Sequence, residues 1–262
     1  MNILFIGDVV GKPGRDAVAQ LAPKLRKQRG LDLIIANGEN SAHGAGLTSS
    51  TVNALLESGV DVITSGDHTW DQKEIYDTIE REPRLIRPLN FPPSAPGRGS
   101  TIVTAGDKTS VAVVNLIGRV FLAQNDDPFR AAQSEVAKLR RQTNVIIVDI
   151  HAEATSEKIA MGRFLDGQVS AVLGTHTHVA TADEQILPKG TAYISDVGMC
   201  GPHDSVLGRD VEAVLKRFLT QMPQKMEVAT GNVLLCGVIL DVDENTGRAR
   251  SIERVRIPTD GA

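Results

Sequence analysis

Residues that can bind metal ions follow the short apolar runs of this chain, and this placement constrains the fold more than any other feature of the sequence. The runs are rich in Val, Ile and Leu and have the length of strands that are buried on both faces. In a parallel sheet they would be adjacent strands whose carboxyl ends open on one edge, so the polar residues after them are expected to lie together. These residues are Asp8, Glu39, Asp67, His68, His151, His176 and His178.

The remaining pattern predicts an α/β protein. Strands are expected at residues 2–7, 31–36, 60–64, 145–150 and 169–173, with helices at 14–29, 49–58, 69–80, 128–141, 156–165 and 208–220. Segments 100–104 and 110–116 predict a hairpin around Gly106 and Asp107, and 232–242 with 248–257 predict a closing antiparallel pair. The strand-rich second half fits two sheets packed face to face between helices. Residues 1–262 are expected to form a single domain.

Composition argues against several classes of function. The chain has 262 residues, of which 41% are hydrophobic and 23% charged, and its net charge is −4. This balance does not favour a nucleic-acid groove, and 3% aromatic residues do not favour a stacking platform for single strands. No apolar run approaches the length of a membrane span, and the start MNILFIGDVV lacks the cationic residues of a signal peptide. We therefore expect a cytoplasmic protein that does not bind membranes.

The candidate ligands supply oxygen and nitrogen but no sulfur. His176 and His178 stand two apart in GTHTH, and on an extended segment two such side chains point to the same side. The carboxylates and imidazoles are numerous enough for two ions. Iron, manganese and zinc accept this mixture, whereas magnesium prefers oxygen ligands. The sequence therefore predicts a dinuclear metal centre.

A dinuclear centre of this kind favours phosphoester cleavage. A hydroxide that bridges the two metals can attack phosphorus, while the metals clamp the attacking and leaving oxygens. Glu39 has two oxygens with which to bridge both ions. His68 is the expected acid for the departing alkoxide, and Asn40 is expected to donate its amide to a phosphoryl oxygen.

The segments around these residues resemble the YmdB-like bacterial metallophosphoesterases over nearly the whole chain. They read GDVVGKPGR, NGENSAHGAGLT, GDHTWD, RPLNFP, NLIGRVF, DIHAEATSEK, GTHTHVATAD and ISDVGMCGPHDSVLG. The resemblance implies a calcineurin-like four-layer α/β/β/α sandwich, a dinuclear iron or manganese centre and homo-oligomers. It also implies hydrolysis of 2′,3′-cyclic nucleotides to 3′-nucleotides, and it leaves 3′,5′-cyclic nucleotides open as further substrates.

Residue roles follow from the same resemblance. It implies that Asp8, Glu39 and His178 hold one metal ion. Glu39, the residue at position 67, His151 and His176 would hold the other, and Asn40 and His68 would contact the phosphate.

Position 67 departs from the family pattern. The family usually has Asn in GNHTW where this chain has Asp67. A carboxylate should bind a cation more tightly than an amide does, but it should also raise the pKa of a water bound to that cation. The same charge is expected to raise the pKa of the neighbouring His68.

Two other functions stay open from the sequence. A phosphomonoesterase, such as a nucleotidase, would use the same metal centre but needs extra cationic contacts for a phosphate dianion. A diesterase instead needs room for a second ester arm. A metal-binding regulatory protein with little turnover would keep the ligands without the reaction.

Overall fold

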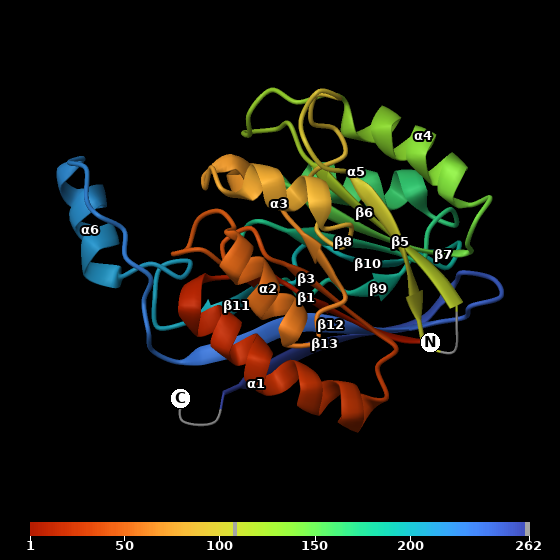
Figure 1. The fold of residues 1–262 in the computed structure, drawn as a ribbon, viewed down its shortest axis with the longest axis horizontal. Coiled ribbons are helices and arrows are strands. Elements are labelled where there is room, and N and C mark those ends of the chain that lie inside the picture. The colour runs from red at the N-terminus through yellow and green to blue at the C-terminus, as the bar shows by residue number, and fades with distance from the viewer. Residues whose placement is uncertain (107–108, 260–262) are drawn as a thin grey trace.

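Two β-sheets lie face to face in a computed structural model that describes residues 1–106 and 109–259 (Figure 1). The first sheet has the order β2-β11-β12-β1-β3-β4, with β13 also paired to β12. Its strands are β1 (Asn2–Ile6), β2 (Asp8–Val9), β3 (Leu33–Asn37), β4 (Val62–Thr64), β11 (Met199–Pro202), β12 (Val233–Val242) and β13 (Ala249–Pro258). The second sheet has the order β5-β6-β7-β8-β10-β9. Its strands are β5 (Ser100–Ala105), β6 (Thr109–Ile117), β7 (Val145–His151), β8 (Ala171–Thr175), β9 (Gln185–Ile186) and β10 (Ala192–Ile194).

Helices cover the outer face of each sheet. These helices are α1 (Gly11–Arg29), α2 (Ser49–Glu57), α3 (Ile75–Arg81), α4 (Pro128–Leu139) and α5 (Thr155–Leu165), whereas α6 (Val211–Thr220) contributes to neither core. Apolar residues of α1, α2 and α3 share a core with the first sheet, and those of α4 and α5 share a core with the second. The order helix, sheet, sheet, helix confirms the four-layer α/β/β/α sandwich.

Side-chain alternation explains why the strands are apolar throughout. Ile3 and Phe5 of β1 point into the core between the sheets, whereas Leu4 and Ile6 point toward the helices. Neighbouring positions on a strand face opposite sides of the sheet. A sheet in the middle of four layers therefore has no polar face, and its strands read as continuous hydrophobic runs.

Most predicted elements are present within a few residues of their expected bounds. Strands β5 and β6 form the expected antiparallel pair, and β12 and β13 form the expected closing pair. Asp107, named for the turn of the first hairpin, lies outside the described residues. Among the described residues, no helix has both the length and the apolar character that crossing a membrane requires.

The helix expected at 69–80 is wrong in its first half. A 3₁₀ helix, η1 (Asp67–Trp70), comes first, and α3 begins only at Ile75. The Thr69 hydroxyl donates to the Gly66 carbonyl at 2.5 Å and lies 2.9 Å from the Ser65 hydroxyl. Local hydrogen bonds of this kind compete with a regular helix, so the chain turns tightly just after β4.

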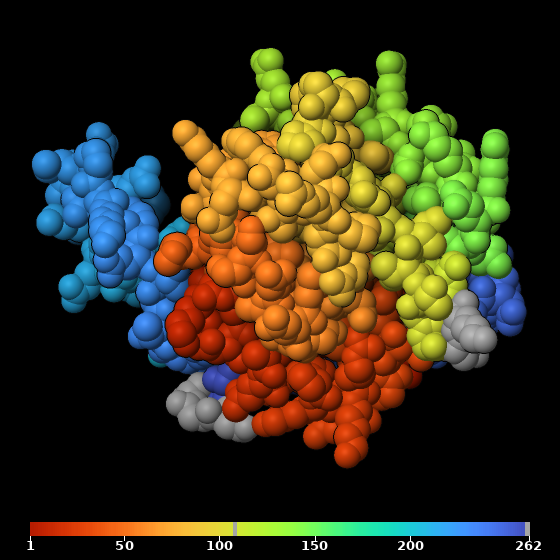
Figure 2. All heavy atoms as spheres, in the orientation of Figure 1, coloured from red at the N-terminus to blue at the C-terminus, as the bar shows by residue number. Residues whose placement is uncertain are grey.

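Helix α6 stands apart from the four layers. Figures 1 and 2 show it at the left, projecting from the body of the molecule. Val214 is its buried residue, whereas Phe218 is 77% and Leu219 84% exposed. An apolar surface this exposed is typical of a contact site.

Candidate metal centre

The predicted ligands come from both sheets and meet where the carboxyl ends of their strands converge. Asp8, Glu39 and Asp67 follow β1, β3 and β4 of the first sheet. His151 ends β7 of the second sheet, and His176 follows β8. The expectation that one sheet edge carries them all is therefore wrong. Face-to-face packing brings two sets of strand ends together instead.

Donor atoms gather in two groups that share one carboxylate. The first donor set is Glu39, Asp67, His151 and His176, and the second is Asp8, Glu39 and His178. Within each set, one donor atom from every residue lies within 4.8 Å of all the others. These are the two groups that the family resemblance implies, and Glu39 belongs to both.

The first donor set is crowded around one imidazole nitrogen. His151 Nε2 lies 2.9 Å from Asp67 Oδ1 and 3.2 Å from Glu39 Oε1. It also lies 3.0 Å from His176 Nδ1, which is itself 3.2 Å from Asp67 Oδ1. Two imidazole nitrogens and two carboxylates that face one another without an intervening Lys or Arg form a ligand arrangement that suits a cation.

The second donor set contains a buried oxygen without a hydrogen-bond partner. Asp8 is fully buried; its Oδ2 accepts from the His176 backbone N–H at 3.1 Å, but its Oδ1 is unpartnered. An unsatisfied buried carboxylate oxygen is costly unless a cation or water balances it. On the other side, the Leu207 carbonyl lies 3.1 Å from His178 Nδ1, so His178 Nε2 faces the site. The residues present therefore fit a second metal ion.

Electrostatic coupling between the groups shifts their pKa values strongly. Burial raises the pKa of Asp8. Burial also acts to raise the pKa values of Glu39 and Asp67, but the neighbouring imidazoles, His151 foremost, together outweigh it, so both pKa values end below their usual range. Burial acts to lower the pKa of His151, yet Glu39 and Asp67 raise it well above its usual value. Protons and metal ions thus compete for this imidazole, and metal binding should weaken as pH falls.

Gly66 is required by the close packing of the first donor set. A Cβ at this position would lie 2.2 Å from Glu39 Oε2 and 2.4 Å from His151 Nε2. Any larger residue before Asp67 would therefore displace two of the donor groups.

His68 lies beside the donor sets with its own orienting carboxylate. Its Nδ1 is 2.8 Å from Asp71 Oδ2, and its Nε2 is 3.7 Å from Asp67 Oδ2. Sequence reasoning missed Asp71, although residues three apart on a 3₁₀ turn are aligned and GDHTWD has that spacing. Burial acts to lower the pKa of His68, but Glu39, Asp67 and Asp71 together raise it. The imidazolium form is therefore stabilised.

Two further side chains that orient ligands were missed. The Thr175 hydroxyl donates to Asp149 Oδ1 at 2.7 Å and lies 2.9 Å from His151 Nδ1. Since its hydrogen goes to Asp149, it accepts from His151 Nδ1–H and leaves Nε2 free for the site. Glu153 Oε2 lies 3.2 Å from His176 Nε2 and orients the second imidazole in the same way. The sequence offered one signal for them: Thr175 directly precedes the predicted ligand His176, and Glu153 follows the predicted ligand His151 by two positions.

Asn40 adjoins both donor sets. Its Nδ2 donates to Glu39 Oε1 at 2.8 Å and lies 3.2 Å from His178 Nε2. The predicted contact residue is therefore next to the shared carboxylate, and it is buried, with 3% of its surface exposed.

The donor sets open into a hollow of about 320 Å³. Its lining includes His68, Glu153, Leu207 and Arg209. Arg209 is the one Lys or Arg of this lining, and its guanidinium donates to the carbonyls of His43, Gly44 and Met226. Among the described residues, the hollow therefore offers no Lys or Arg whose head group is free of backbone carbonyls.

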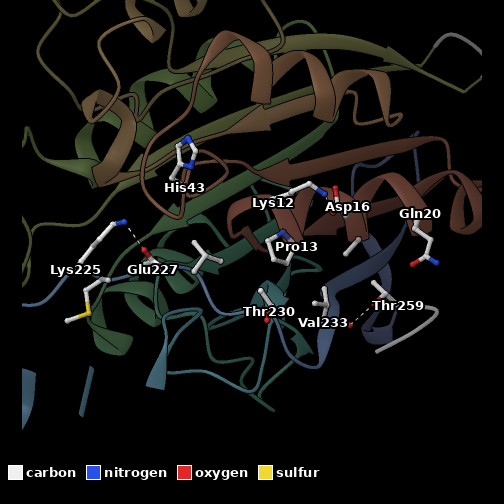
Figure 3. A pocket seen from close by; sticks show the side chains of 13 residues that line it. Lys12, Pro13, Asp16, Gln20, His43, Lys225, Glu227, Thr230, Val233 and Thr259 are labelled. Atoms are coloured by element: carbon white, nitrogen blue, oxygen red, sulfur yellow. Dashed lines mark hydrogen bonds and ion pairs between the residues drawn. The ribbon is translucent and has the colours of Figure 1, made fainter. Parts of the chain in front are cut away.

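A larger hollow of about 990 Å³ lies elsewhere, between the start of α1 and residues 225–233 (Figure 3). Its two lysines are paired with acidic neighbours: Lys12 with Asp16 at 2.5 Å and Lys225 with Glu227 at 2.7 Å. None of the predicted ligands lines it. The predicted ligands thus lie at the smaller hollow and not at this one.

Comparison with known proteins agrees with this geometry. The family model described as YmdB-like protein matches residues 4–255. The 2′,3′-cyclic-nucleotide 2′-phosphodiesterase of Bacillus subtilis (strain 168) is 54% identical over 260 residues, which cover 99% of this chain and 98% of that protein. A hypothetical protein from Thermus thermophilus superposes with a TM-score of 0.93 at 43% identity, covering 99% of this chain and 100% of the other. A crystal structure described as a novel phosphatase, from Mycoplasma pneumoniae, superposes with a TM-score of 0.92 at 38% identity, covering 98% and 93%.

Proposed function

This chain belongs to the YmdB-like protein family, and from that premise we propose that it is a metal-dependent phosphodiesterase that hydrolyses 2′,3′-cyclic nucleotides. The observation that carries the proposal is the pair of donor sets that share Glu39. The Bacillus subtilis relative, whose name states this activity, matches nearly the full length of the chain.

The proposed cofactor is a pair of metal ions, iron or manganese, with zinc also compatible with the donor atoms. Asp8, Glu39 and His178 would hold one ion. Glu39, Asp67, His151 and His176 would hold the other. When bound, two such ions supply an ionised water at neutral pH and stabilise charge on the phosphoryl oxygens.

The protein's own groups would bind the phosphate and move the proton. Asn40 Nδ2 carries two hydrogens: one goes to Glu39 Oε1, and the other faces His178 Nε2 at 3.2 Å, an atom that would bind a metal ion. With the metal bound, that second hydrogen would be free to donate to a phosphoryl oxygen as charge develops. Asp71 holds His68 Nδ1, so His68 Nε2–H is the proton donor for the departing 2′-oxygen. Asp71 lies outside both donor sets, so its hydrogen bond to His68 would stabilise the protonated ring with metal ions bound as well.

Charge in the hollow supports a diester substrate over a monoester. A phosphate monoester is a dianion and needs more cationic contacts than a diester, which carries one negative charge. The guanidinium of Arg209 is already committed to three backbone carbonyls. The exposed carboxylate of Glu153 adds further negative charge to the lining.

A substrate panel tests the reaction class. Manganese-loaded protein should hydrolyse 2′,3′-cyclic AMP and bis-p-nitrophenyl phosphate much faster than p-nitrophenyl phosphate, with 3′,5′-cyclic AMP measured beside them. If only the monoester turns over, the protein is a phosphomonoesterase. If metal-loaded protein turns over none of the four, a regulatory role replaces the enzymatic one.

Asp67→Asn tests the effect of the additional carboxylate. The variant should retain both metal ions, because the amide oxygen still faces His151. Removal of one negative charge favours ionisation of the nucleophilic water, so the acid limb of the pH–rate profile should move to lower pH. Metal analysis and initial rates across pH check this. An unchanged profile at unchanged metal content would show that the charge at position 67 does not control the nucleophile.

The exposed apolar side chains of α6, among them Phe218 and Leu219, support assembly into a homo-oligomer. The proposed partners are therefore a small cyclic nucleotide and further copies of the same chain.

A further inference from the structure

The GTHTH segment is not extended, contrary to the expectation from the sequence. Strand β8 ends at Thr175, and the φ angles of His176 and His178 are 101° and 63°. Residues with a side chain rarely adopt such angles, and they persist only where surrounding contacts hold them. Both imidazoles reach the site because of this turn, but they enter different donor sets.

Thr177, between the two histidines, is held by a buried carboxylate. Its backbone N–H donates to Asp196 Oδ2 at 3.0 Å, and its hydroxyl donates to the same oxygen at 2.8 Å. Asp196 is 1% exposed, and its Oδ1 accepts from the Gly198 N–H at 2.9 Å. The carboxylate is therefore fixed on both sides and in turn fixes the residue at the centre of the turn.

A buried lysine balances the charge of this carboxylate. Lys158 of α5 is 1% exposed, and its Nζ lies 2.8 Å from Asp196 Oδ2. Its stem passes beside Gly174, where a Cβ would lie 2.9 Å from Lys158 Cδ and 1.8 Å from the Ser195 carbonyl oxygen. Gly174 thus leaves space for the lysine to reach Asp196.

The geometry points to Lys158, Asp196 and Thr177 as positioning residues that hold His176 and His178 in the conformation needed to bind two metal ions. None of the three belongs to a donor set. The inference rests on the proposed metal centre and deepens it, because one turn controls a ligand of each set. Loss of the Thr177 hydroxyl contact should therefore weaken metal binding without removing any ligand.

The buried ion pair of Lys158 and Asp196 could position the two histidines or only stabilise the fold, and its presence does not distinguish these roles. Breaking such a pair is strongly destabilising in general, so Lys158→Met tests stability as much as position. Thr177→Val is the decisive variant, because it keeps the side-chain shape, the backbone N–H and the ion pair. Thr177→Ser is its matched control, because it keeps the hydroxyl.

The experiment is a calorimetric titration of metal-free protein with Mn²⁺, together with the thermal midpoint of each metal-free variant. Loss of a group that orients a ligand typically weakens metal binding by about 10–100-fold. We expect a loss of that size for Thr177→Val, with Thr177→Ser close to wild type and the thermal midpoints of the two variants alike.

The outcomes separate this inference from the proposed function. Wild-type affinity in Thr177→Val would overturn the positioning role, as would a lower turnover of 2′,3′-cyclic AMP at unchanged Mn²⁺ affinity, which would indicate contact with substrate. A wild-type protein that binds no Mn²⁺ would overturn the metal centre itself, and the positioning role with it.

Discussion

Glu39→Gln is expected to abolish stable binding of both metal ions and nearly all phosphodiesterase activity. Glu39 is the one residue common to the two donor sets, and its Oε1 lies 3.2 Å from His151 Nε2 and 2.8 Å from Asn40 Nδ2. Gln retains the shape but replaces the carboxylate that would contact both ions with a neutral amide that has one oxygen. Since metal ions supply several kcal/mol of transition-state stabilisation, turnover of 2′,3′-cyclic AMP should fall by at least ~10³-fold.

Elemental analysis of the purified variant and its steady-state kinetics measure these two effects together. Glu227→Gln is the matched control, because Glu227 lines the larger hollow and pairs with Lys225 away from the donor sets. It should retain wild-type metal content and rate. Two metal ions and near-normal turnover in Glu39→Gln would show that Glu39 does not bridge the ions.

His68→Ala is expected to slow hydrolysis most for substrates whose leaving group must be protonated as it departs. A ribose oxygen leaves as a strongly basic alkoxide, and loss of a general acid typically costs about 10²–10⁴-fold. Nitrophenolate leaves readily without protonation, so hydrolysis of bis-p-nitrophenyl phosphate should change much less. Metal content should stay at the wild-type level, since His68 lies outside both donor sets.

Rates for the two substrates, compared in wild type and variant, check this prediction. His43→Ala serves as the control, because His43 lines the larger hollow. Equal losses on both substrates would assign His68 to phosphate binding and leave the proton donor unidentified.

Local patterns were sufficient to locate most elements of this fold. The runs before Asp8, Glu39, Asp67 and His151 are strands because Val, Ile and Leu fill both faces of a covered sheet. Helix α2 begins after a capping box, in which the Thr48 side chain accepts from the Thr51 N–H. The helix expected from residue 69 failed because hydrogen bonds of the Thr69 side chain, which periodicity does not report, favour a 3₁₀ turn.

The candidate site was predictable in its residue types but not in its geometry. All six predicted ligands lie in the two donor sets, because their position after strands depends on chain order alone. Asp71 and Glu153 were missed because their role depends on which ring nitrogen of a histidine they face. Asp196 and Lys158 were missed because their contacts with Thr177 and with each other span 19 and 38 residues.

The sequence by itself therefore determined the strand pattern and the donor atoms, since both follow from the identity of residues and their spacing along the chain. Only the tertiary structure decided that two sheets share the ligands, that Glu39 joins the two donor sets, and that the GTHTH turn is left-handed. The physical reason is that these properties arise from packing between distant segments. The face-to-face sheets bring the ends of distant strands together. Asp196, paired with the buried Lys158, accepts two hydrogen bonds from Thr177, in a turn whose φ angles residues with a side chain rarely adopt.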